Sequence, residues 1–194
     1  MQILKKLYDW TLLKSRHPKA MWFLSVISFT ESSFFPIPPD IILIPMVIAK
    51  RVNAFLYAFI CSLSSVAGGI LGYCIGYYLY NTIGILIVEY YGLSNMFLIF
   101  EEYYILYGIW IVLGAGFTPF PFKFITIASG VFGLNFFQFV LVSAISRSLR
   151  FYLIAILLKI FGNVIEKLIN KYFNLLAISF FILLFGSFLM LKLL

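Results

Sequence analysis

The chain has 194 residues, of which 63% are apolar, 20% are aromatic and only 11% are charged, and its mean hydropathy is +1.07. Soluble domains carry about 25% charged residues, so this composition excludes a soluble globular protein and indicates an integral membrane protein. The net charge of +7 does not predict nucleic-acid binding. The basic residues lie in short segments beside apolar stretches, where they set topology and contact lipid headgroups.

The N-terminal half begins with an amphipathic stretch followed by two short apolar arms. Residues 1–19 place apolar side chains at helical spacing against a lysine-rich face, which predicts a helix lying on the membrane surface. The arms on either side of Pro36 and Pro38 are too short to span, because a spanning helix needs about 20 residues. Proline also removes a backbone donor and clashes with the preceding turn. We therefore expect residues 20–49 to form a re-entrant hairpin.

The rest of the chain repeats this order of segments. We expect a spanning helix, an external interfacial segment rich in glutamate and tyrosine, a second re-entrant hairpin interrupted by Pro119 and Pro121, and two further spanning helices. In chain order these segments are residues 54–80, 82–104, 105–134, 136–158 and 174–191. Residues 20–165 form the predicted membrane domain.

Two spacings indicate that the halves are related. Pro36 and Pro119 are 83 residues apart, and Ser64 and Ser146 are 82 apart. A single crossing between the two units turns the second upside down relative to the first, which makes an inverted repeat. The predicted fold class is an all-α integral membrane protein. It contains an inverted repeat of two re-entrant helical hairpins, each followed by a transmembrane helix, plus a C-terminal transmembrane helix.

The distribution of basic residues predicts the orientation of the chain. With the N-terminus in the cytoplasm and both hairpins returning to their own side, almost all Lys and Arg flanks are cytoplasmic, as the positive-inside rule requires. A single span over residues 20–49 would put Lys50 and Arg51 on the side opposite the N-terminal cluster. The re-entrant interpretation removes that conflict.

Five charged residues fall within or beside the membrane segments: Glu31, Asp40, Lys123, Arg147 and Arg150. At a helix centre each would cost about 2.5–3.5 kcal/mol, so we expect them to face one another or a wet cavity. Arg147 and Arg150 share a helix face with Ser143 and are predicted, together with Lys123, to bind an anion such as a phosphate. Glu31 and Asp40 are their predicted partners and the groups that would couple transport to protons.

The repeat offset also places Asp40 opposite Lys123, which predicts an ion pair between these two residues. An alternative is that the charged groups only satisfy backbone groups exposed by the prolines. They would then have no role in transport. A second alternative is that the charged side chains lie shallow enough to reach the headgroups.

The remaining sequence features indicate packing rather than catalysis. Close helix packing, within the chain or in a homodimer, is predicted by a ridge of small residues: Ser64, Gly68, Gly72 and Gly76. The chain contains no catalytic motif. Cys61 and Cys74 lack the spacing of a metal or redox site. We therefore expect no enzyme activity, no cofactor and no metal.

Two motifs and the segment after them resemble the DedA family, also called the VTT-domain or SNARE-associated Golgi group. The first motif is FTESSFFPIPPD at residues 29–40. The second is GAGFTPFPFK at residues 114–123, which runs on to ASGVFG at residues 128–133. Together with SRSLRF at residues 146–151, the second motif is most similar to the small bacterial members called the YqaA-like subgroup. The resemblance covers residues 20–165.

The resemblance implies a multi-pass protein of the bacterial inner membrane with two inverted re-entrant hairpins. Relatives are implicated in envelope homeostasis, dependence on the proton-motive force, recycling of undecaprenyl phosphate and lipid scrambling. Glu31 and Asp40 match the family's functional first-loop acids. Many relatives carry an arginine pair in the second loop, where this chain has Phe117 and Thr118.

We therefore expect a transporter or flippase that moves a lipid phosphate, either undecaprenyl phosphate or a phospholipid, with membrane lipids as its partners. Two alternatives remain open: a proton-coupled exporter of a small cation, and a membrane scaffold that transports nothing. Activity indifferent to the loss of Arg147 would favour the exporter. Function unchanged by neutralisation of Glu31 would favour the scaffold.

Overall fold

A computed structural model describes residues 19–34, 38–90, 94–118 and 120–162, and all regular secondary structure in these ranges is helical. Three of the helices are long and apolar enough to cross a membrane: Arg51–Leu79, Phe97–Phe117 and Phe136–Gly162. Together with the composition, they identify an integral membrane protein. Almost all of the predicted surface helix 1–19, the predicted C-terminal span 174–191, Pro36 and Pro119 lie outside the described residues.

The two predicted helix breaks lie close to prolines. The first two helices are α2 (Ala20–Ser33) and α3 (Asp40–Ala49), with Pro38 and Pro39 just before α3. Proline removes a backbone donor and clashes with the preceding turn, which favours a break there, although α3 accommodates Pro45 in its interior. In chain order the later helices are α4 (Ala54–Leu79), a π-helical turn (Tyr80–Gly84), α5 (Ile85–Tyr90), α6 (Ser94–Phe117), α7 (Phe122–Val131) and the helix Phe136–Gly162.

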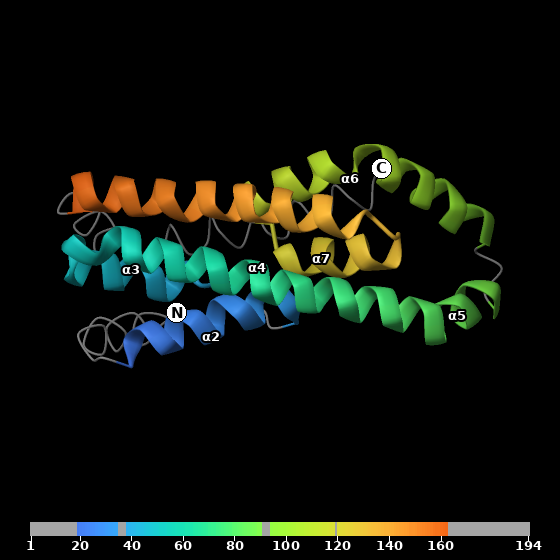
Figure 1. The fold of residues 1–194 in the computed structure, drawn as a ribbon, viewed down its shortest axis with the longest axis horizontal. Coiled ribbons are helices and arrows are strands. Elements are labelled where there is room, and N and C mark those ends of the chain that lie inside the picture. The colour runs from blue at the N-terminus through green and yellow to red at the C-terminus, as the bar shows by residue number, and fades with distance from the viewer. Residues whose placement is uncertain (1–18, 35–37, 91–93, 119, 163–194) are drawn as a thin grey trace, which may run out of the picture.

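Four helices form two pairs that enter the molecule from opposite ends (Figure 1). Helix α2 runs from one end to the middle and α3 returns to that end. Helix α6 runs from the other end to the middle and α7 returns. Helices α4 and Phe136–Gly162 run the length of the molecule in opposite directions. The C-terminal ends of α2 and α6 therefore both lie near the centre.

Helix α6 is continuous across residue 104, where the expected interfacial segment 82–104 and the second hairpin 105–134 were to meet. Tyr104, one of the tyrosines of the expected interfacial segment, is only 7% exposed. Its hydroxyl is 2.9 Å from Ser129 Oγ and donates to the carbonyl of Ile125 at 3.2 Å. Both partners belong to α7, so this buried tyrosine joins the two arms of the second helix pair.

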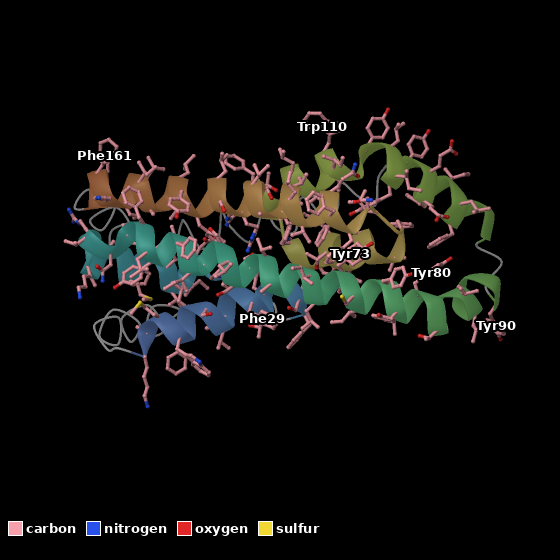
Figure 2. All side chains as sticks on the ribbon, viewed as in Figure 1. Phe29, Tyr73, Tyr80, Tyr90, Trp110 and Phe161 are labelled. Carbon is pink, nitrogen blue, oxygen red and sulfur yellow. The ribbon has the colours of Figure 1, made fainter. Side chains whose placement is uncertain are left out.

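The ridge of small residues on α4 packs against other helices of the same chain, which is one of the two arrangements expected from the sequence. A Cβ added at Gly68 would lie 2.0 Å from the Phe29 carbonyl oxygen, and one at Gly76 would lie 2.0 Å from the Ile127 oxygen. Real atoms cannot approach so closely, so only glycine lets α2 and α7 pack against α4 at these points. Large apolar side chains such as Trp110 and Phe161 lie on the outside (Figure 2), the side that lipid would cover.

Candidate functional site

Glu31 and Arg147 form a buried ion pair near the middle of the molecule. Glu31 is in the last turn of α2, and Arg147 lies 116 residues later on the helix Phe136–Gly162. Arg147 Nη2 donates to Glu31 Oε2 at 2.6 Å, and the two residues are 2% and 8% exposed. A buried charge is tolerated only when it is paired and hydrogen-bonded. The pair therefore fixes the end of α2 against the long helix.

Two serine hydroxyls close this pair into a ring of hydrogen bonds. Arg147 Nε donates to Ser65 Oγ at 2.6 Å, Ser65 Oγ lies 2.6 Å from Ser32 Oγ, and Ser32 Oγ donates to Glu31 Oε2 at 3.2 Å. Arginine can only donate and an ionised carboxylate can only accept. The hydroxyl of Ser65 therefore donates its hydrogen bond to Ser32 Oγ, and the hydroxyl of Ser32 donates to Glu31 Oε2. The ring joins α2, α4 and the long helix.

Aromatic rings hold the Arg147 guanidinium in place. Its Cζ lies 4.9 Å from the centroid of the Phe122 ring and 4.7 Å from that of Phe151. Both rings are fully buried, and a desolvated cation–π contact is worth about 2 kcal/mol. Phe122 begins α7. Arg147 therefore also contacts the second helix pair.

Asp40 and Arg150 form a second ion pair, one turn along the same long helix. Arg150 Nη2 contacts Asp40 Oδ2, and Asp40 is the first residue of α3. Arg150 Nη1 also donates to the backbone carbonyls of Thr118 and Phe117. These carbonyls lie at the C-terminal end of α6, where the last turn leaves acceptors unsatisfied and the helix dipole favours a cation. Arg150 therefore connects the turns of both helix pairs.

Three buried polar atoms lack a hydrogen-bond partner among the described residues: Asp40 Oδ1, Arg150 Nε and Ser143 Oγ. None of them belongs to Glu31 or Arg147. The two pairs thus differ in completeness. Both contacts use a single carboxylate oxygen. Arg147 Nε is bonded to Ser65, whereas Arg150 Nε has no partner among the described residues.

The predicted ion pair between Asp40 and Lys123 is wrong. Arg150 reaches Asp40 from the long helix, and Lys123 Nζ instead lies 5.3 Å from the Phe124 ring centroid. Lys123 is in the first turn of α7. Of the five charged residues singled out from the sequence, the structure thus brings together Glu31, Asp40, Arg147 and Arg150, and leaves Lys123 outside both pairs.

The sequence did not predict that Ser32, Ser65 or the rings of Phe122 and Phe151 belong to this site. One signal was available for Ser65. It precedes Arg147 by 82 residues, the offset that separates Ser64 from Ser146. Within the described ranges, no group of three or more His, Cys, Asp or Glu residues could hold a metal ion.

These features define a class of protein, namely a polytopic helical membrane protein with two ion pairs in its interior. The chain is 40% identical over 155 residues to an uncharacterized protein of Haemophilus influenzae, and this match covers 80% of each chain. It is 36% identical over 154 residues, 79% of this chain and 80% of the relative, to a Histophilus somni protein described as "Uncharacterized protein HI0703 homolog". The chain belongs to the family of these two proteins. No family model matches the chain, and no solved structure matches it.

Proposed function

We propose that this protein is a DedA-like transporter that moves a lipid phosphate across the bacterial inner membrane, with its N-terminus in the cytoplasm. In this proposal α2–α3 and α6–α7 are re-entrant hairpins of an inverted repeat, and each is followed by one spanning helix. The observation that carries the proposal is the position of the two acid–arginine pairs, Glu31–Arg147 and Asp40–Arg150, where the turns of the two helix pairs meet.

The cost of these charges supports a functional role. Ionisable groups inside a membrane are expensive and mark substrate or ion pathways. Helices α3 and α7 both begin near the centre of the molecule. The positive ends of their dipoles add to the charge of the two arginines, in the way that broken helices receive anionic groups in transporters. A phosphate headgroup fits this combination better than a cation does.

In the absence of substrate, the two acids are the partners of the two arginines. Glu31 and Asp40 neutralise Arg147 and Arg150 when no phosphate is bound. Exchange of a carboxylate for a phosphate keeps an arginine paired during transport, provided that the released acid takes up a proton or meets water. This exchange is how the proposed transport would be coupled to protons.

The test measures transbilayer movement of a labelled polyprenyl phosphate in proteoliposomes, with and without a pH gradient. Glu31→Gln and Arg150→Gln should each abolish movement. Lys50→Gln is the control, because it removes one positive charge from an exposed position outside both pairs and should leave movement intact. Absence of movement by correctly folded wild-type protein would reject the lipid-phosphate proposal.

A membrane scaffold is the second candidate, and the mutual neutralisation of the two pairs favours it. Arg150 contacts α3 and the end of α6, so both pairs could serve only to hold the helix pairs together. In that case the wild-type protein moves no lipid. Charge-neutral double variants that fold would also retain its cellular role.

A further inference from the structure

We propose that Asp40 competes with phosphate for the guanidinium of Arg150, here called the phosphate seat, whereas the Glu31–Arg147 pair stays intact when phosphate binds. This inference rests on the proposed function and assigns different tasks to two pairs that look alike in the sequence. The ligand chemistry is a phosphate monoester or free phosphate.

The geometry of Arg150 shows an incomplete fork. A guanidinium presents Nε and Nη2 side by side, a spacing that suits two oxygens of one anion. Asp40 occupies Nη2 with Oδ2, while Arg150 Nε and Asp40 Oδ1 have no partner among the described residues. A phosphate has three acceptor oxygens, and two of them would accept hydrogen bonds from Nε and Nη2 of Arg150. It would therefore bind Arg150 with more hydrogen bonds than Asp40 makes.

The guanidinium of Arg150 would keep its orientation after Asp40 has left it. Arg150 Nη1 donates to the carbonyls of Phe117 and Thr118, and these bonds do not involve α3. The guanidinium thus remains oriented by the end of α6. A preorganised donor costs less ordering entropy on binding, so removal of Asp40 should strengthen phosphate binding.

The guanidinium of Arg147 is more buried than that of Arg150, and its Nε already has a partner. The Arg147 side chain is 3% exposed, against 14% for that of Arg150, and the Glu31 side chain is 10% exposed, against 17% for that of Asp40. Its Nε is already bonded to Ser65, its Nη2 to Glu31, and two aromatic rings flank it. A phosphate on the Nε–Nη2 edge would have to displace Ser65 and Glu31. That edge of Arg147 is therefore occupied, unlike the same edge of Arg150.

The test measures dissociation constants by calorimetry in phosphate-free maltoside micelles, with inorganic phosphate in one series and decyl phosphate in another. Asp40→Asn should tighten binding about tenfold or more, since a charge-assisted competitor is removed. Combining it with Arg150→Gln should remove the gain. Asp40→Ser serves the same purpose if the asparagine variant does not fold.

A control separates the seat from general electrostatics. Glu102→Gln removes one negative charge from an exposed position on α6. It should leave the dissociation constant within about twofold of wild type. Tighter binding of both ligands assigns the seat to the phosphate group alone, and tighter binding of decyl phosphate only assigns it to a lipid headgroup.

An unchanged dissociation constant in folded Asp40→Asn overturns the inference, as does an equal gain in Glu102→Gln. Its failure is distinguishable from failure of the proposed function. Transport of polyprenyl phosphate by wild type without any gain in Asp40→Asn would sink only the competitor role. A gain in binding by a protein that moves no lipid would leave the seat standing and reject transport.

Discussion

Arg147 Nε donates a hydrogen bond to Ser65 Oγ at 2.6 Å, and the two residues are 82 positions apart in the chain. The same offset separates Ser64 from Ser146. Under the proposed inverted repeat, Ser65 and Arg147 are equivalent positions, and equivalent positions that touch lie beside the pseudo-twofold axis. The repeats differ there in charge, because the first contributes acids from α2 and α3 while the second contributes arginines from its long helix.

Breaking the buried pair should destabilise the protein strongly. Glu31→Gln or Arg147→Gln leaves one buried charge without its partner, and such losses cost about 3 kcal/mol or more. The double variant Glu31→Gln/Arg147→Gln should cost less than the two single changes together, because no charge is left unpaired. Melting temperatures in detergent measure the effect. Strictly additive losses would mean that the two residues do not interact.

The serine ring should be sensitive at Ser65. Ser65→Ala removes the acceptor of Arg147 Nε and the donor to Ser32, and a buried group left unsatisfied costs about 1–3 kcal/mol. The matched control is Ser64→Ala, whose hydroxyl makes a part-buried contact with Ser25 and should cost less. Thermal unfolding of the two variants side by side decides the point. Equal losses would remove the special role of the ring.

The glycines of α4 should reject even one methyl group. Gly68→Ala and Gly76→Ala would press a Cβ against backbone oxygens of α2 and α7, and overpacking costs about 1–3 kcal/mol or more. Gly114→Ala has nothing within 4 Å of the added Cβ and should be neutral or slightly stabilising, since alanine favours helix. Melting temperatures test this ranking. A harmless Gly68→Ala would contradict the close contact.

The re-entrant topology makes a labelling prediction. In a protein with Cys61 and Cys74 replaced by alanine, single cysteines at Lys19 and Val52 should react with an impermeant maleimide from the same side of the membrane. Both residues flank the α2–α3 pair at one end of the molecule. A cysteine at Tyr90, beyond α4 and 84% exposed, should react from the other side. Opposite labelling of positions 19 and 52 would mean that this pair spans the membrane.

The sequence by itself determined the membrane class, the two helix breaks near the prolines, and four of the charged residues that form ion pairs in the structure. These follow from local chemistry, because composition, helix length and the missing proline N–H act within a few residues. Helices Ala54–Leu79 and Phe136–Gly162 begin at the first residues of the expected spans 54–80 and 136–158.

Only the tertiary structure decided which charges meet. Asp40 pairs with Arg150 rather than Lys123. This choice depends on which side chain, from a helix more than 100 residues later in the chain, reaches the first residue of α3. Helix α6 continues past residue 104, and the hydroxyl of Tyr104 is hydrogen-bonded to Ile125 and Ser129 of α7. The sequence shows that each buried charge needs a partner, whereas the partner itself depends on which helices the fold brings together.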